Sequence, residues 1–151
     1  MNAMGTINEI LGNKGTNVWS VSPDITVFDA IQLMADKNIG ALLVTEHDKL
    51  VGIISERDYT RKVALKGKSS KQTAVREILS GKVISVTPGH TVEDCMRLMT
   101  THHIRHLPVI ENDRIIGIVS IGDLVNSIIS AQHVTINQLQ TYIAGIPVER
   151  L

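Results

Sequence analysis

Two short stretches of the chain place a hydroxyl and a carboxylate at the same spacing. The sequence Gly-Ile-Ile-Ser ends at Ser55 and precedes Asp58, and Gly-Ile-Val-Ser ends at Ser120 and precedes Asp123. The apolar run before each serine is typical of a buried strand. An ionised aspartate only accepts hydrogen bonds, and it can accept from both hydroxyls of one ribose. The spacing therefore places a hydroxyl and a carboxylate together where each strand gives way to a helix, and such a pair can offer a ribose two kinds of oxygen partner.

These stretches belong to a longer internal repeat. At a constant offset of 65, residues 20–59 align with residues 85–124 without a gap, and 17 of the 40 pairs are identical. Such self-similarity indicates that one supersecondary unit was duplicated. Upstream, residues 7–11 resemble residues 75–79 at an offset of 68, so the first copy has a slightly longer loop, a change that surface loops tolerate.

Each copy is predicted to begin with a short helix, at residues 7–11 or 75–79, and an extended segment that ends at Pro23 or Pro88. The main helix follows. An aspartate three residues after Thr26 and after Thr91 favours these threonines as N-caps. Apolar side chains at intervals of three and four residues then give each main helix one buried stripe. The stripes are Val27, Ala30, Ile31 and Met34 in the first copy, and Val92, Cys95, Met96 and Met99 in the second.

Two strands and a closing helix complete each copy. The strands are predicted at residues 41–45 and 50–54, and at 106–110 and 115–119, with polar turns between them. The order β-α-β-β-α, repeated twice, predicts an α+β (α/β-like) fold. We expect repeats at residues 6–66 and 74–131, a linker at 67–73, and a C-terminal helix and tail at 132–151.

The C-terminal segment is predicted to form an amphipathic helix over residues 132–146, because Ile136, Leu139 and Ile143 recur at helical spacing. Its apolar face can pack on the same chain or contact a second copy, and the sequence leaves both open.

Composition narrows the classes of function. Lys and Arg total 15, as do Asp and Glu, so no overall charge attracts nucleic acid or an anionic membrane. Hydrophobic residues at 43% can build a core, whereas aromatic residues at 3% offer few stacking platforms for bases. The lone Cys95 is expected to be an inert buried thiol. Without a long apolar run or a secretion signal, we expect a cytoplasmic protein with no membrane or nucleic-acid partner.

These features resemble those of a CBS-domain pair, also called a Bateman module. The resemblance rests on two Gly-apolar-apolar-Ser-x-x-Asp motifs, each after a Thr-Val-x-Asp helix start, and on Ile-Arg-His-Leu-Pro-Val at residues 104–109. It covers roughly residues 6–130, and the chain resembles the stand-alone kind. It implies tandem CBS repeats packed by pseudo-twofold symmetry, with N-terminal and C-terminal helical extensions, and a disk-like homodimer.

The resemblance also implies a ligand, since family members commonly bind AMP, ADP, ATP, NAD or S-adenosylmethionine in clefts between the repeats. Asp58 and Asp123 would then hold the ribose hydroxyls, with Ser55 and Ser120 near ribose or phosphate oxygens. The adenine ring would enter an apolar slot that offers backbone groups. The expected slot residues are Val21, Ser22, Ile39, Gly40 and Ala41 in the first copy, and Val86, Thr87, Ile104, Arg105, His106 and Pro108 in the second.

The two copies differ where charge matters. The first has Arg57 where the second has Gly122, and the second has Arg105 and His106 where the first has glycine and alanine. Arg57 and Arg105 are the expected phosphate ligands, because a guanidinium meets phosphate oxygens in a bidentate fashion. His106 can assist near neutral pH. The second site is therefore expected to suit a charged ligand better.

Structural interpretations stay open beside these functional ones. The two aspartates can cap helices, the two serines can satisfy backbone groups at strand ends, and Arg57 can be a surface charge. A metal site at His102, His103 and His106 is not expected, because no carboxylate lies at ligand spacing.

The leading hypothesis is a regulatory module, not an enzyme, that senses AMP, ADP, ATP or NAD. It would signal to a partner protein or through rearrangement of its dimer. Alternatives are S-adenosylmethionine binding, or a ligand-free interaction module that regulates a separate enzyme. A nucleotide-acting enzyme is less favoured, because the sequence has no P-loop, no Gly-x-Gly-x-x-Gly and no metal-ligand set.

Overall fold

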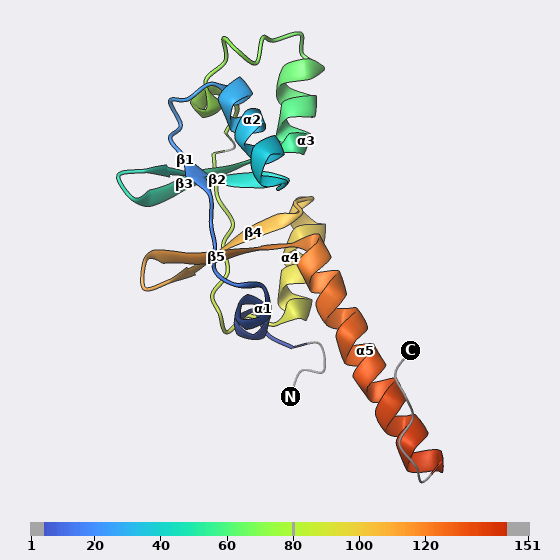
Figure 1. The fold of residues 1–151 in the computed structure, drawn as a ribbon. Coiled ribbons are helices and arrows are strands. Elements are labelled where there is room, and N and C mark those ends of the chain that lie inside the picture. The colour runs from blue at the N-terminus through green and yellow to red at the C-terminus, as the bar shows by residue number, and fades with distance from the viewer. Residues whose placement is uncertain (1–4, 80, 145–151) are drawn as a thin grey trace. The chain divides into compact units, whose positions relative to one another are not determined.

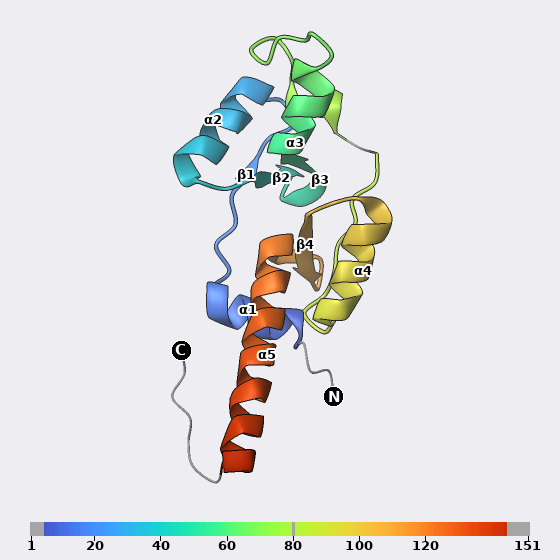
Figure 2. The same cartoon turned by 90° about the vertical axis from the view of Figure 1, so that its right-hand side faces the viewer.

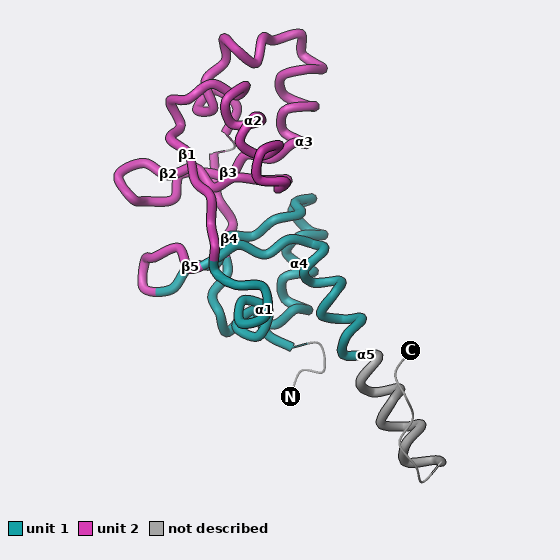
Figure 3. The backbone as a smooth tube through the Cα atoms, viewed as in Figure 1, with its two compact units in different colours: residues 1–16, 86–111, 117–151 teal, residues 17–85, 112–116 magenta. Residues whose placement is uncertain are grey.

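The computed structural model describes residues 5–79 and 81–144, and the side chains of residues 5–79 and 81–132 (Figure 1). These residues form two compact units (Figure 3). Unit 1 contains residues 5–16, 86–111 and 117–144, and unit 2 contains residues 17–79, 81–85 and 112–116. The units do not follow the sequence repeats, because the segment ahead of each repeat belongs to the unit of the other repeat.

Unit 2 is built on a three-stranded sheet. Strand β1 (Ser20–Val21) runs parallel to β2 (Ala41–Glu46), and β2 pairs antiparallel with β3 (Lys49–Ser55). The helical elements of this unit are α2 (Val27–Lys37), α3 (Glu56–Asp58), the π-helix η1 (Tyr59–Ala64) and the 3-10 helix η2 (Val75–Ile78).

One apolar core holds unit 2 together. It combines buried side chains of α2, β2, β3, η1 and η2, which are Val27, Ala30, Met34, Leu42, Val44, Ile54, Val63, Val75 and Ile78. Val75 and Ile78 come from η2, so the segment ahead of the second repeat supplies part of the core around the first.

Unit 1 repeats this plan with a smaller sheet. Strands β4 (His106–Glu111) and β5 (Arg114–Ser120) form a two-stranded sheet, and Val86 makes a parallel bridge to Val109 where unit 2 has β1. The helices are α1 (Ile7–Lys14), α4 (Val92–His102) and α5 (Ile121–Ala144). Helix α5 packs against α1 and α4 (Figures 1 and 2).

The predicted α+β fold of tandem repeats is confirmed, and most predicted elements lie within two residues of the observed ones. Both hairpin turns have two central residues with positive φ, as a type I′ turn requires: His47 (53°) and Asp48 (64°), and Asn112 (52°) and Asp113 (62°). The side chains of Thr26 and Thr91 accept from the backbone N–H groups of Asp29 and Asp94, as expected of N-caps.

The C-terminal prediction differs from the structure in one respect. The closing helix of the second copy and the amphipathic helix expected over residues 132–146 form one continuous helix, α5, which reaches Ala144. The side chains of Ile136, Leu139 and Ile143 lie outside the described residues, as do residues 145 and 146. Their predicted contacts therefore stay a prediction.

The exchanged segments dock through equivalent backbone hydrogen bonds. In unit 1 the N–H of Val92 donates to the carbonyl of Gly5 (3.1 Å), and in unit 2 the N–H of Val27 donates to the carbonyl of Thr73 (2.8 Å). Val92 and Val27 begin α4 and α2, and the first N–H groups of a helix have no acceptor within it. The exchanged segments satisfy these donors.

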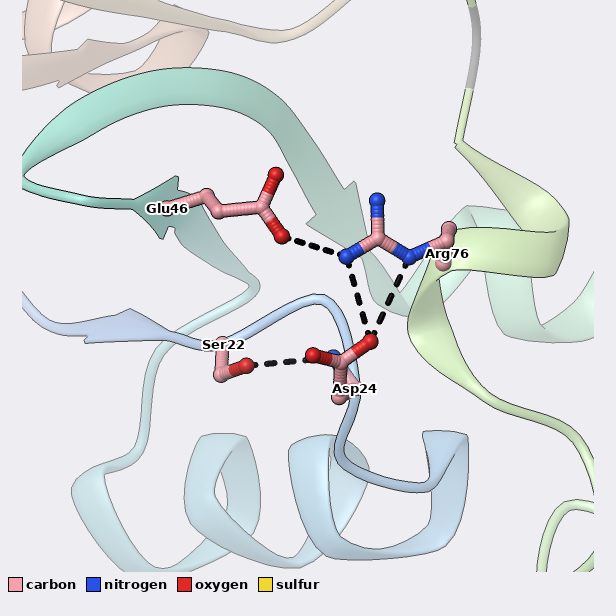
Figure 4. A network of polar contacts seen from close by, with 4 residues as sticks. All are labelled: Ser22, Asp24, Glu46 and Arg76. Carbon is pink, nitrogen blue, oxygen red and sulfur yellow. Dashed lines mark hydrogen bonds and ion pairs between the residues drawn. The ribbon is translucent and has the colours of Figure 1, made fainter.

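A polar network also holds η2 in unit 2 (Figure 4). Arg76 donates from Nε and Nη2 to Asp24 Oδ1 (3.3 and 3.1 Å) and forms an ion pair with Glu46. Asp24 lies just before α2, and Glu46 ends β2. Because Arg76 is exposed, water and salt screen these charges and the network adds little stability.

Each glycine of the repeated motif lies against a leucine of an exchanged segment. A Cβ on Gly117 would come within 2.6 Å of Leu11 Cδ2, and a Cβ on Gly52 within 2.7 Å of Leu79 Cδ2. The two leucines occupy equivalent positions, at the offset of 68 found in the sequence. Glycine is required here by close packing.

Gly117→Ala should lower the free energy of unfolding by about 1–3 kcal/mol, because Leu11 must move within a filled core. Gly12→Ala is the matched control. A Cβ there meets nothing within 4 Å, so a helical alanine should stabilise slightly, by about 0.5–1 kcal/mol. Urea unfolding measures both changes. The penalty of Gly117→Ala should disappear in a Leu11→Ala background, and an unchanged penalty there would refute the packing explanation.

Candidate functional site

The first Ser-x-x-Asp pair forms a capping box at the junction of β3 and α3. The N–H and hydroxyl of Ser55 donate to Asp58 Oδ2 (2.9 and 3.1 Å), and the N–H of Asp58 donates back to Ser55 Oγ (3.2 Å). Both residues are half-buried. The carboxylate is therefore held in one orientation at the end of a strand.

The second pair repeats this geometry at the junction of β5 and α5. The N–H of Ser120 donates to Asp123 Oδ2 (2.8 Å), and the N–H of Asp123 donates to Ser120 Oγ (3.2 Å). The structural interpretation of both pairs, as helix caps, is thus correct. It leaves a ligand role open, because a carboxylate offers more acceptor positions than the donors of one serine fill.

Each aspartate also pairs with a lysine that was not among the predicted site residues. Lys62 Nζ lies 3.4 Å from Asp58 Oδ1 and donates to the carbonyl of Ile78 (3.0 Å). Lys14 Nζ lies 2.7 Å from Asp123 Oδ2 and donates to the carbonyl of Ile118 (2.9 Å). The i,i+4 spacing of Asp58 and Lys62 could have revealed the first pair. No local pattern could have revealed the second, which spans 109 positions.

The pKa of Asp123 lies below its ordinary value. Burial alone would raise this pKa, but hydrogen bonds from Lys14 and from the Ser120 backbone, together with the charge of Lys14, outweigh burial. Asp123 is therefore ionised near neutral pH and acts purely as an acceptor.

Backbone hydrogen bonds bring part of each predicted adenine slot to these junctions. The N–H of Glu56, the first residue of α3, donates to the carbonyl of Gly40 (3.1 Å). In unit 1 the N–H of Ile121, the first residue of α5, donates to the carbonyl of Arg105 (2.8 Å). The predicted residues Ile39, Gly40 and Ala41 thus lie at the first junction, and Ile104, Arg105 and His106 at the second.

The other slot residues lie further along the sheets. Ala41 pairs with Ser55, whereas Val21 pairs with Val44. Three residues along a strand separate them by about 10 Å. Ser22 Oγ accepts from the N–H of Asp24 (3.1 Å), near the Arg76 network (Figure 4).

Unit 1 has the same register, because the parallel bridge of Val86 is to Val109 and not to His106. The N–H of Thr87 donates to His90 Nδ1 (3.0 Å). The N–H of Val86 donates to the carbonyl of the buried Pro108 (3.0 Å).

Trp19 lies nearer the first junction than Val21 does, because its carbonyl accepts from the N–H of Leu43 (3.1 Å). Only the parallel register of β1 with β2 places Trp19 near this junction, and the sequence of so short a strand does not reveal that register. The adenine roles of Val21, Ser22, Val86 and Thr87 stay predictions.

The two predicted phosphate ligands lie at the junctions. Arg57 is half-buried between Ser55 and Asp58, and Arg105 is exposed next to the start of α5. In unit 2, a pocket of about 240 Å³ is lined by Ile39, Gly40 and Glu56 together with side chains of α2. Its lining includes neither Ser55 nor Asp58, so the pocket reaches the slot side of the junction only.

The structure also places Cys95 and the side chains of the kinds that bind metal ions. Cys95 is fully buried in α4, and burial raises the pKa of its thiol to about 11, which disfavours the reactive thiolate. Within the described ranges, no three His, Cys, Asp or Glu side chains are grouped so that they could hold a metal ion. In the same part of the chain, no helix has the length and apolar character needed to cross a membrane.

Comparison with known proteins supports the predicted resemblance of the two repeats to CBS domains. The family model for the CBS domain matches residues 13–65 and 75–130. The chain is 41% identical over 150 residues to CBS domain-containing protein CBSX3, mitochondrial, of Arabidopsis thaliana, covering 93% of this chain and 72% of that protein. A putative signal-transduction protein with CBS domains from Burkholderia ambifaria is 49% identical, with a TM-score of 0.81 over 84% of this chain and 96% of that one.

A more distant solved structure carries ligands. The CBS domain pair of protein MJ0100, in complex with 5′-methylthioadenosine and S-adenosyl-L-methionine, is 26% identical to this chain. It has a TM-score of 0.69 and covers 80% of this chain and 93% of that one.

Lys14→Met and Asp123→Asn should each lower the free energy of unfolding by about 1 kcal/mol at pH 7, and the double variant should lose less than the sum. The pKa of Asp123 is depressed in the folded protein. The stabilisation is therefore complete above the ordinary carboxyl pKa, about 3.9, and is lost as the pH falls through the folded value. Urea unfolding at a series of pH values measures the coupling. A coupling that persists at low pH would contradict the ion pair. Arg97→Met, which removes exposed ion pairs of α4, is the control.

Proposed function

Because the chain belongs to the CBS-domain family, with two of these domains in tandem, we propose that it is a regulatory module that binds adenosine-containing nucleotides. The sugar would bind at Asp58 in unit 2 and at Asp123 in unit 1. One observation carries the proposal: both carboxylates are fixed by the same capping-box hydrogen bonds at equivalent strand ends.

The chemistry of a ribose suits these junctions. Its 2′- and 3′-hydroxyls are neighbouring donors, and an ionised carboxylate can accept from both. Hydrogen bonds to a charged acceptor are roughly twice as strong as neutral ones. A carboxylate that is already oriented loses little conformational freedom when the sugar binds, which favours affinity.

The ligand is proposed to be AMP, ADP, ATP or NAD, with S-adenosylmethionine as the alternative. The adenosine compounds bound by MJ0100 support this class of ligand. Arg57 and Arg105, adjacent to the two junctions, are the proposed phosphate ligands and favour a nucleotide over an uncharged nucleoside. No catalytic cofactor is proposed.

The module is proposed to signal through its own association or a partner protein, not to transform the nucleotide. Two exposed apolar side chains one turn apart on α5, Val125 and Ile129, support a homodimer. The relatives named as CBS domain-containing or signal-transduction proteins support a regulatory role. The cytoplasm is kept as the proposed location, although the Arabidopsis relative is named as a mitochondrial protein.

Isothermal titration of protein freed of co-purified ligand tests the proposal. AMP, ATP, NAD and S-adenosylmethionine are titrated separately, and at least one should bind. Asp58→Asn with Asp123→Asn should weaken binding at least tenfold, because an amide cannot accept from two hydroxyls with the strength of a carboxylate.

The matched control is Asp94→Asn. Asp94 forms the same capping box with Thr91, at the start of α4, and has no proposed ligand. This variant should lose stability because its capping box is weakened, as in each single Asp→Asn substitution, but it should keep its affinity. Flat titrations with all four compounds, or equal affinity in the double variant, would refute nucleotide binding at these carboxylates.

A further inference from the structure

Lys14 occupies the carboxylate that the proposed sugar requires. Asp123 Oδ2 accepts from the N–H of Ser120 (2.8 Å) and from Lys14 Nζ (2.7 Å). A carboxylate oxygen has two lone-pair positions, so both positions of Oδ2 are used. A ribose that engages both oxygens of Asp123 must therefore displace the ammonium group.

The displaced ammonium group needs a new partner. Lys14 keeps its hydrogen bond to the carbonyl of Ile118 (2.9 Å), but its side chain is only 34% exposed, so water replaces the carboxylate incompletely. The phosphate of a nucleotide can supply that partner, whereas adenosine brings no charge. The start of the long helix α5 at the same junction also favours an anion.

We propose that Lys14, in addition to Arg105, makes the unit 1 site selective for phosphorylated over unphosphorylated adenosines. This inference rests on the proposed function. When AMP binds, the sugar hydroxyls take the place of Lys14 as donors to Asp123. The ammonium group of Lys14 then pairs with the phosphate in place of Asp123. When adenosine binds, the sugar hydroxyls displace Lys14 from Asp123 in the same way. No phosphate is present to pair with Lys14, so one ion pair is lost.

The corresponding pair in unit 2 has a different geometry. Lys62 lies 3.4 Å from Asp58 and faces Oδ1, whereas Oδ2 accepts from both the N–H and the hydroxyl of Ser55. Because this ion pair is longer, displacing Lys62 should cost less. Unit 2 should therefore discriminate less strongly between AMP and adenosine than unit 1 does.

The test measures the dissociation constants of AMP and adenosine for the full chain carrying Asp58→Asn, which leaves the unit 1 site intact. AMP should bind at least tenfold more tightly than adenosine. Adding Lys14→Met should weaken AMP and tighten adenosine, so that the preference falls about tenfold. Lys14→Arg should retain the preference because it keeps the charge. Arg97→Met, which removes a cation elsewhere in unit 1, should also retain it.

The outcomes separate this inference from the proposed function. An unchanged preference in folded Lys14→Met protein overturns the role of Lys14, as does loss of the preference in Arg97→Met. If Lys14→Met does not fold, Lys14→Gln is measured in its place against the same expectation. Failure of the Asp58→Asn protein to bind AMP, or binding that survives an added Asp123→Asn, overturns nucleotide binding at Asp123 itself.

Discussion

The hydrogen bond from a serine N–H to an aspartate carboxylate, formed at Ser55–Asp58 and again at Ser120–Asp123, is the interaction on which the proposed site of each unit depends. It closes a strand and opens a helix within three residues. It also fixes the direction of a charged acceptor at the strand end. The proposed binding group is thus also the structural cap, so the fold orients the carboxylate in advance of a ligand.

The exchange of segments connects this junction to the core of unit 1. Helix α1 brings Leu11 onto Gly117 of β5 and Lys14 onto Asp123, just after the end of the same strand. Packing of the leucine requires glycine in the motif, and the lysine sets the charge at the carboxylate. The glycine of the repeated motif is therefore needed for close packing and the aspartate for its charge, although both residues contact α1.

The sequence predicted what local chemistry determines. Thr26 and Thr91 cap helices, and polar turns join the strands at His47-Asp48 and Asn112-Asp113, because neighbouring residues decide these features. It did not predict that α1 belongs with the second repeat, since an apolar helix face does not specify its partner. The short strand β1 likewise carries too little pattern to fix its register, so the distance of Val21 from Ser55 emerged only from the pairing of Val21 with Val44. The contact between Lys14 and Asp123 depends on the exchange and was inaccessible for the same reason.

A regulatory role needs a ligand that distinguishes two states of the protein. The units offer a physical means, because ligand binding at Asp123 would alter the partner of a residue on α1. The central claim is that the carboxylates hold both sugar hydroxyls. The most direct measurement compares AMP with 2′,3′-dideoxy-AMP, which differs only in lacking those hydroxyls. The account predicts that the dideoxy compound binds at least tenfold more weakly, and equal affinities for the two compounds would contradict it.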